Sequence, residues 1–384
     1  MSIERTSADA AINLAERPQT RKACQAVVRH IWQQNLEVGS RLAPTQQLGR
    51  ELGICMNTLQ SAMKVLADSG IIERRRKKGT LVHCRRLGHA GPKLFSVGLL
   101  WRRSDQGVFS LGMFKSICEQ LQRNGCEDRT YSCDFPYPDE QQYSLNRVVG
   151  LQQDIAAGRV DGLISPMCFN PGASGLPICH IAMHHEGTWG AMLDKQKVVR
   201  QGLMVLLKSG CKRPAVIYSA SHAPQYYHLD AQAAQASMAE AGLRPADDNL
   251  VVFGREMSQE QIIDQLVTSR RKSQRPDGLV ITDDHRAHDL AQRLRDLGEQ
   301  PLLAVLTNKG IPFRYALPVI RFEFDLEEHA AVSVRLLVDH MLGIGEPSQI
   351  VRVAAHLAYD DLPADLVAQL KRGGLIATSQ STDI

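Results

Sequence analysis

Five consecutive cations, Arg74–Lys78, form the segment of this sequence best suited to binding a polyanion. They lie within IIERRRKKGTLV (71–82), where apolar pairs flank the charges and Gly79 follows them. Clustered lysine and arginine side chains can neutralise successive phosphates of a nucleic acid. On its own, such a run is equally typical of a solvated loop or a nuclear-localisation-like segment. The elements around the run must decide between these interpretations.

Histidine-rich segments raise a second question, that of metal binding or catalysis. CHIAMHHE (179–186) holds the adjacent His184 and His185, whose side chains would point to opposite sides of a strand, and DDHRAHD (283–289) holds His285 and His288. Neither carries an H-E-x-x-H or paired C-x-x-C pattern, and YSASHAP (218–224) lacks the G-x-S-x-G elbow of a hydrolase. We interpret these histidines as surface or pocket side chains. The sequence predicts no metal, no cofactor and no enzymatic activity.

Length and charge indicate more than one module. The 384 residues are enough for two or three domains. Residues 1–93 hold 16 Lys and Arg against 7 Asp and Glu, a net +9, whereas the remainder has 29 against 34, a net −5. A basic head on a mildly acidic body suggests that the head meets a polyanion. No apolar run approaches the roughly 20 residues that span a bilayer, the N-terminus lacks a signal-peptide core, and nine scattered cysteines suit a reducing compartment, so we expect a cytoplasmic protein.

The basic run follows three predicted helices. RKACQAVVRHIWQQ (21–34) repeats apolar residues at helical spacing. TQQLGRELG (45–53) opens on Thr45, which suits an N-cap, and closes on Gly53, while ICMNTLQSAMKVLADSG (54–70) ends on Gly70. Two short helices joined by a tight turn are typical of a helix-turn-helix. The basic segment then reads as two short strands joined by a turn, which is a wing.

Residues 21–83 resemble the winged helix-turn-helix of the GntR family of bacterial transcription regulators in helix lengths, glycine positions and wing. That family usually has arginines where this sequence has Gln46, Met56 and Gln60, so cationic contact would shift towards Arg50, Lys64 and the wing. The residues that the resemblance places against DNA are Thr45, Gln46, Arg50, Met56, Asn57, Thr58, Gln60, Lys64, Arg74, Arg75, Arg76, Lys77, Lys78 and Gly79.

From residue 94 onward, apolar strands alternate with amphipathic helices. LFSVGLL (94–100) and PLLAVLTN (301–308) are among the predicted strands, and GMFKSICEQLQRNG (112–125) and RAHDLAQRLRDLG (286–298) among the helices. Sustained alternation of this kind predicts parallel α/β sheets, here in two lobes. The order of elements, with phrases such as DIAAGRVDGLI and LLVDHMLGIGEP, resembles the effector domain of the LacI family, which is built like a type I periplasmic sugar-binding protein. A GntR-type head on this body is the layout of arabinose-repressor-like regulators.

The LacI resemblance implies a ligand site between the lobes, at the carboxyl ends of strands. The residues that it places there are Trp101, Arg102, Ser104, Phe109, Ser165, His184, Asp194, Asp230, Asp283, Asp284, Asn308 and Phe322. The family usually has Asn-Asp at 283–284, often aspartate at 308 and a sugar-binding arginine at about 230. Carboxylates and amides bind sugar hydroxyls, and aromatic rings stack on the C–H face of a sugar. As alternatives, Trp101 and Phe322 would be core residues, and Asp194 and Asp284 helix caps.

The sequence therefore predicts an α/β protein in which an N-terminal winged helix-turn-helix precedes a two-lobed, type I periplasmic-binding-protein-like domain. The predicted boundaries are a DNA-binding domain at 1–83, a linker at 84–93, an effector-binding and dimerisation domain at 94–364, and a C-terminal tail at 365–384.

The two resemblances together imply a ligand-responsive bacterial transcription regulator, by default a repressor of a sugar-utilisation operon. A homodimer would bind a near-palindromic double-stranded operator, a small sugar-like effector would release or modulate it, and no membrane would be involved. The alternative is a solute-binding or enzymatic α/β protein whose basic N-terminal module serves assembly. The salt dependence of DNA affinity separates the two.

Overall fold

The structure is a computed structural model that describes the chain apart from residues 1–16, 88–92, 102–107, 134–142, 167–168, 171–173, 182–187, 221–226, 245–248, 255–256, 312–313, 347, 359–363 and 373–384. The chain divides into two compact units. The first unit comprises Met1–Ala191 and Glu327–Val351, and the second comprises Met192–Leu326 and Arg352–Ile384. The helix-turn-helix head therefore shares the first unit with one α/β lobe. No described helix is long and apolar enough to cross a membrane.

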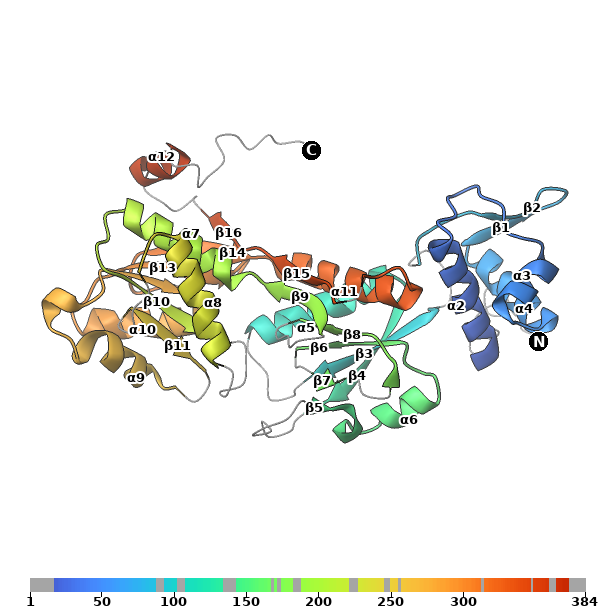
Figure 1. Ribbon diagram of the computed structural model, residues 1–384, viewed down its shortest axis with the longest axis horizontal. Helices are drawn as coiled ribbons and strands as arrows, with labels where there is room; N and C mark the ends of the chain where they lie inside the picture. The colour runs from blue at the N-terminus through green and yellow to red at the C-terminus, as the bar shows by residue number, and fades with distance from the viewer. Residues whose placement is uncertain are drawn as a thin grey trace, which may run out of the picture. The chain divides into compact units, whose positions relative to one another are not determined.

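The head consists of three helices and a two-stranded wing, as predicted (Figure 1). Its elements are α2 (Pro18–Gln33), α3 (Thr45–Leu52), α4 (Met56–Asp68), β1 (Ile72–Arg75) and β2 (Gly79–Val82). The buried stripe of α4, which includes Leu59, Met63 and Leu66, packs together with the buried face of α2, which includes Val28 and Ile31. Apolar residues three and four positions apart share one helix face, so this packing fixes which side chains of α4 face outward.

One predicted helix signal in the head is wrong. Pro44, not Thr45, occupies the N-cap of α3, and no side chain caps that helix. Thr45 is already the first helical residue. A capping side chain must come from the residue before the helix, where it can accept a hydrogen bond from the free N–H groups of the first turn, so the Thr45 hydroxyl does not cap α3. The predicted C-terminal signal is confirmed, because Gly53 ends α3 in the left-handed conformation with φ 65°.

The α/β lobe of the first unit is built on a sheet with strand order β15-β9-β8-β6-β3-β4. The strands are β3 (Phe95–Trp101), β4 (Cys126–Ser132), β6 (Gly162–Ser165), β8 (Ile178–His180), β9 (Trp189–Leu193) and β15 (Ile350–Val353), and the helices are α5 (Val108–Arg123), α6 (Leu151–Ala156) and α11 (Leu326–Leu342). A small second sheet joins β5 (Tyr143–Ser144) and β7 (Phe169–Asn170), and η1 (Leu145–Arg147) precedes α6. The pairs β3–β4, β3–β6, β6–β8 and β8–β9 are all parallel.

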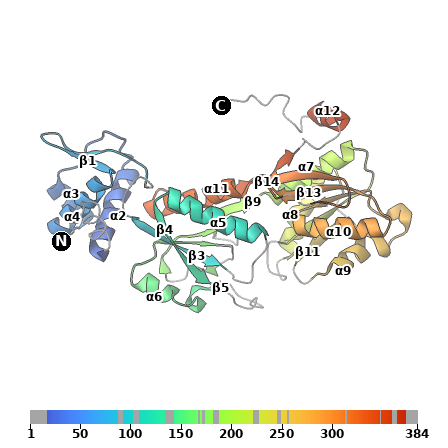
Figure 2. The ribbon, with the colours of Figure 1, turned by 180° about the vertical axis from the view of Figure 1, so that it is seen from behind.

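The second unit is a six-stranded sheet of order β11-β10-β12-β13-β14-β16. Its strands are β10 (Pro214–Ser219), β11 (Leu250–Phe253), β12 (Gly278–Ile281), β13 (Leu302–Asn308), β14 (Val319–Phe324) and β16 (His356–Ala358), and only the β14–β16 pair is antiparallel among them. Its helices are α7 (Lys195–Lys208), α8 (Tyr227–Glu240), α9 (Gln259–Ile263) with the π-helical turn η4 (Asp264–Thr268), α10 (Asp284–Asp296) and α12 (Ala364–Arg372), with a short 3₁₀ turn η5 (Lys272–Gln274). Helices α7 and α8 lie on one face (Figure 1), and α9 and α10 cover the other (Figure 2).

This architecture confirms the predicted alternation of strands and helices. Ser258 is the N-cap of α9 and forms a capping box with Gln261. One difference lies near the C-terminus, where α12 occupies part of the predicted tail. The apolar spacing within Ala364–Arg372 is sufficient for a helix, and the prediction overlooked it because the segment is short.

Helix α2 docks the head onto the lobe of the first unit through one carboxylate. The side chain of Asp161 accepts hydrogen bonds from Arg21 Nη2 at 2.7 Å, from Gln25 Nε2 at 3.0 Å and from the backbone N–H of Ser96 at 2.8 Å. Gln25 Nε2 also donates to the carbonyl of Leu94 at 2.7 Å. Because both members of the Arg21–Asp161 ion pair are mostly buried, removing one would leave a charge without its partner.

The C-terminal half of α2 extends this docking to the end of α11. Arg29 Nε donates to the carbonyl of Met341 at 2.7 Å, and Gln33 Nε2 donates to the carbonyl of Leu342 at 3.2 Å. We call these bonds, together with those to Asp161 and Leu94, the α2 docking contact. Backbone carbonyls at a helix C-terminus lack partners within the helix, so Arg29 and Gln33 supply hydrogen-bond donors to them.

Candidate functional sites

The exposed face of α4 carries the side chains that the sequence placed against DNA. Met56, Asn57, Gln60 and Lys64 are exposed and recur at helical spacing, opposite the buried stripe. Met56 is 37% exposed and adds an apolar side chain to this outward face. Polar and apolar side chains on one outward helix face are the combination that reads base edges in a major groove.

Residues from α3 and the start of α4 adjoin this face. Gln46 and Arg50 are exposed on α3, whereas Thr45 and Thr58 are half-buried. The hydroxyl of Thr58 shares a hydrogen bond of 3.0 Å with Cys55 Sγ at the N-cap of α4. Thr58 is thus partly engaged within the head, and Gln46 and Arg50 remain open to an outside partner.

The wing presents most of its positive charge without compensation. β1 and β2 pair antiparallel, with Arg75 opposite Gly79, and all five cations from Arg74 to Lys78 are exposed. Arg75 Nη2 lies 2.9 Å from a Glu73 carboxylate oxygen, but the other four form no ion pair with any residue that the structure describes. Because uncompensated cations at a turn tip attract phosphate oxygens, the surface favours a polyanion.

Arg41 joins the wing, and sequence reasoning missed it. Arg41 forms an isolated antiparallel bridge with Leu81, and its guanidinium lies over Gly79. A Cβ at position 79 would be 2.9 Å from Arg41 Nε, and the φ of Gly79 is +84°. Glycine at this position therefore allows both the turn and the close approach of a sixth cation. The only sequence signal for Arg41 was its basic type, because the bridge is a tertiary contact.

Cys55 is a chemical probe for the N-terminus of α4. It is exposed, and a hydrogen bond from Thr58 lowers the pKa of its thiol, whereas burial raises the pKa values of Cys24, Cys126 and Cys179 to about 12. Since the thiolate is the reactive form, we expect iodoacetamide to modify Cys55 before the other described cysteines. We expect bound DNA to slow this modification at least about tenfold, because α4 would lie in the groove.

Peptide mass spectrometry of alkylated protein with and without DNA measures this protection. Cys118, half-buried in α5 with its thiol pKa raised to about 11 by burial, serves as the internal control whose slow rate should not change with DNA. Equal rates at Cys55 in both samples would place the N-terminus of α4 outside the DNA interface.

In the second unit, two acidic residues at the start of α10 lie beside Asn308 at the end of β13. Asp283 caps the helix, accepting from the backbone N–H of Arg286 at 2.8 Å. The carboxylate of Asp284 accepts a hydrogen bond from Asn308 Nδ2. Burial, and then the neighbouring charge of Asp283, raise the pKa of Asp284. The structure thus brings together three of the predicted ligand residues, with Asp283 also serving as a helix cap.

A half-buried lysine lies near Asp283, and sequence reasoning missed it. Lys195, the first residue of α7, donates from Nζ to the carbonyl of Ser219 at 2.9 Å and lies 5.7 Å from the ring centroid of Tyr218. Burial lowers the pKa of Lys195, and the charges of Asp230 and Asp283 oppose this effect. Asp230, on α8, is only 3% exposed. In the sequence, Lys195 follows Asp194 as an ordinary acidic–basic pair, and nothing near it indicates the charges of Asp230 and Asp283.

Two other residues predicted for the ligand site have structural roles. Asp194 is the N-cap of α7 and accepts from the backbone N–H of Lys197 at 3.0 Å. Phe322 is 0% exposed, because Ile320, Phe322 and Phe324 are the inward-facing residues of β14. We therefore assign Phe322 to the core, the alternative that the sequence left open.

Two candidates of the first unit, Trp101 and Ser165, are the last residues of β3 and β6. Trp101 is mostly buried, donates from Nε1 to Ser110 Oγ at 3.1 Å and meets Phe114 edge to face with ring centroids 5.3 Å apart. Ser165 is buried at the end of β6, and Phe109 is half-buried in α5. Arg102, Ser104 and His184 lie outside the described residues. Within the part of the chain that is described, no group of three histidine, cysteine or acidic side chains is arranged to hold a metal ion.

Comparison with known families gives these surfaces a context. The family described as bacterial regulatory proteins, gntR family, matches residues 19–82. The head is a GntR-family DNA-binding domain. The periplasmic binding protein-like domain matches residues 204–359. Both predicted resemblances are confirmed, and the chain joins a gntR-type regulatory head to a body with a periplasmic-binding-protein-like fold.

Solved structures support the fold of the body. A regulatory protein of the LacI family from Chloroflexus aggregans has a TM-score of 0.54 at 16% identity, over 68% of this chain and 96% of that chain. The Cra transcriptional dual regulator from Pseudomonas putida, in complex with fructose 1-phosphate, gives 0.52 at 19%, over 68% and 97%. The transcriptional regulator CelR in its cellobiose complex gives 0.51 at 14%, over 83% and 98%. No relative was found among curated proteins.

Proposed function

We propose that this protein is a ligand-responsive transcription regulator that represses a sugar-utilisation operon. The observation that carries the proposal is the head's outward surface: an exposed α4 face beside a wing whose cations are largely without ion partners among the described residues. The α4 face would read bases in the major groove, and the wing, with Arg41, would contact phosphates and add salt-dependent affinity. Base preference would come from Asn57, Gln60 and Met56, in place of the arginines common in the family.

The polar cluster of the second unit is the proposed contact with the effector. Asp284, Asn308 and Asp230 offer oxygens and an amide to hydroxyl groups, and the half-buried Lys195 offers a cation. A neutral sugar with several hydroxyls fits such a set, since carboxylates accept two hydrogen bonds and the amide both donates and accepts. CelR and Cra, whose bodies share this fold, are seen with cellobiose and fructose 1-phosphate, which supports a sugar-like ligand here.

The remaining features of the proposal follow from this arrangement. A homodimer would act in the cytoplasm. It would bind a near-palindromic operator, because the two-fold symmetry of its paired heads matches two half-sites related by the same symmetry. The domain boundaries proposed from the sequence assign 94–364 to effector binding and dimerisation. No catalytic step is proposed, because the polar residues of the body suffice for binding and no nucleophile with an adjacent base was recognised in the sequence.

Selection of genomic fragments by the purified full-length chain, followed by a thermal-shift screen against sugars, tests the proposal. We expect a near-palindromic sequence to be enriched, and one sugar at about 100 times its Kd to stabilise the protein by roughly 2.7 kcal/mol and to weaken DNA binding. A sugar that binds while DNA affinity is absent or insensitive to salt would favour a solute-binding protein with a basic assembly module.

A further inference from the structure

The backbone on either side of Arg41 is held against the wing by hydrogen bonds. The N–H of Gly39 donates to the carbonyl of Val82 at 2.7 Å, and the N–H of Leu42 donates to the carbonyl of Thr80 at 2.9 Å. The side chain of Leu42 is only 2% exposed, which anchors the same segment in the core of the head. Arg41 therefore lies on a short segment that pairs antiparallel with β2, and its backbone has a fixed place beside the wing.

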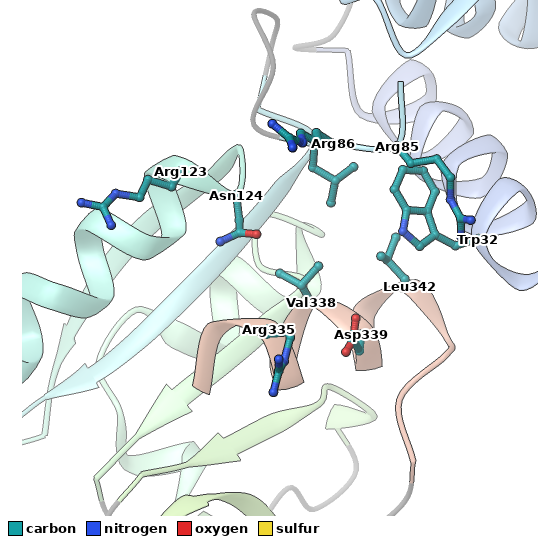
Figure 3. A pocket seen from close by; sticks show the side chains of 10 residues that line it. Trp32, Arg85, Arg86, Arg123, Asn124, Arg335, Val338, Asp339 and Leu342 are labelled. Carbon is teal, nitrogen blue, oxygen red and sulfur yellow. The ribbon is translucent and has the colours of Figure 1, made fainter. Parts of the chain in front are cut away.

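The chain just before this segment is fixed as well. Arg85, which follows the wing, has its Nη1 3.0 Å from a carboxylate oxygen of Glu37 and 3.2 Å from Oδ1 of Asn35. The guanidinium of Arg85 also lies over the ring of Trp32 at the end of α2, 5.5 Å from its centroid (Figure 3). These contacts tie the residues that enter the Arg41 segment to the residues that leave β2.

The guanidinium of Arg41 lies beside the turn at the tip of the wing. Its Nε and Nη2 are 2.9 and 3.3 Å from the position that a Cβ on residue 79 would take, so only glycine at that position allows this approach. Arg41 is exposed and forms no ion pair with any residue that the structure describes. It is thus an exposed cation whose place relative to the turn is set by backbone pairing.

We propose that Arg41 enters the DNA minor groove next to the major groove that α4 would occupy, and that it selects narrow, A·T-rich steps there. The inference rests on the proposed DNA binding by the head. A narrow minor groove has an enhanced negative potential that attracts arginine. A guanidinium is planar and more weakly hydrated than an ammonium, so it loses its water at a lower cost on entering the groove.

This role differs from that of the five wing cations, Arg74–Lys78. Contacts with phosphates require only positive charge near the backbone and carry no sequence information directly. Arg41 has a fixed backbone and a guanidinium packed against the turn, so less conformational freedom is lost when it is inserted at one place. The minor groove of a G·C pair also carries the amino group of guanine, which an A·T pair lacks. Arg41 would therefore add a preference for A·T pairs to the general affinity of the wing.

Fluorescence anisotropy of the full-length chain with two duplexes tests the proposal. One duplex is rich in G·C pairs, and the other has the same sequence with inosine in place of guanine. Inosine removes the amino group from the minor groove and leaves the hydrogen-bonding edges of the major groove unchanged. We expect the wild type to bind the inosine duplex at least about fivefold more tightly. Because α4 would meet the same major-groove edges in both duplexes, this preference reports on the minor groove.

Two matched variants assign the preference to a residue. Arg41→Lys keeps the charge and replaces the planar guanidinium by a strongly hydrated ammonium, so we expect it to bind the two duplexes equally. Arg76→Lys makes the same change at an exposed position of the wing turn, and we expect it to keep the preference for the inosine duplex.

Equal affinity of the wild type for both duplexes would overturn the proposal. A preference that persists in Arg41→Lys would also overturn it, as would one that disappears in Arg76→Lys as well, because the wing as a whole would then read the groove. Each of these results leaves DNA binding by the head in place. If the wild type bound neither duplex, the proposed function would fail together with this inference.

Discussion

Replacing all of Arg74–Lys78 by alanine should weaken binding to operator and unrelated DNA alike, on the order of a hundredfold at physiological salt. Four of these side chains lack an ion partner among the described residues, so their charge is free to neutralise phosphates. Each lost phosphate contact lowers the slope of log affinity against log salt by about 1. Fluorescence anisotropy at several salt concentrations, with operator and scrambled duplexes, measures both the affinity and the slope.

A matched control removes charge elsewhere. Arg271 and Lys272 are exposed in the second unit, and the Arg271→Ala/Lys272→Ala variant should bind DNA as the wild type does. A wing variant that weakens only the operator complex would mean that the wing reads bases. Unchanged affinity for both duplexes would remove the wing from the interface.

Asp284→Ala should leave DNA affinity intact and abolish the response to the sugar. The carboxylate accepts a hydrogen bond from Asn308 and is half-buried, so a hydroxyl bound there would meet a well-oriented acceptor. Hydrogen bonds to charged groups contribute about 1.5–3 kcal/mol, which corresponds to a loss of sugar affinity of about 10- to 150-fold. Thermal shift with the sugar, together with DNA anisotropy with and without it, measures the effect.

Asp289→Ala is the matched control for this substitution. Asp289 lies on the same helix, is considerably exposed and meets His285 only at 3.9 Å. We expect this variant to keep both DNA affinity and sugar response. If Asp284→Ala also keeps its sugar response, Asp284 does not contact the effector.

Local patterns predicted the elements of this protein well. Helical spacing of apolar residues placed α4 with its buried stripe, and glycines such as Gly53 marked helix ends, because these signals act within a few residues. The alternation of inward and outward residues along a strand would also have assigned Phe322 to the core and not to the ligand site. β14 buries every second residue from Ile320 to Phe324, and this alternation follows from the pleat alone.

The side chains that the sequence missed depend on tertiary contacts. Lys195 is unusual only because its half-buried ammonium lies near the charge of Asp230, which is distant in sequence. Arg41 matters because a bridge to Leu81 brings it over the wing, and Asp161 matters because α2 packs beside it. Residue spacing along the sequence cannot predict these tertiary contacts, because each depends on how separate elements pack.

The α2 docking contact bears on which spacings between operator half-sites the protein would accept. A head on a loose tether can reach half-sites at many separations, but here Asp161 and the carbonyls at the end of α11 hold α2 in one orientation. In a dimer the distance between the two reading helices is then set by the lobes. Each base pair inserted between half-sites rotates one of them by about a tenth of a helical turn relative to the other. We therefore expect DNA affinity to depend on the rotational alignment of the two half-sites around the DNA helix as strongly as on their sequence.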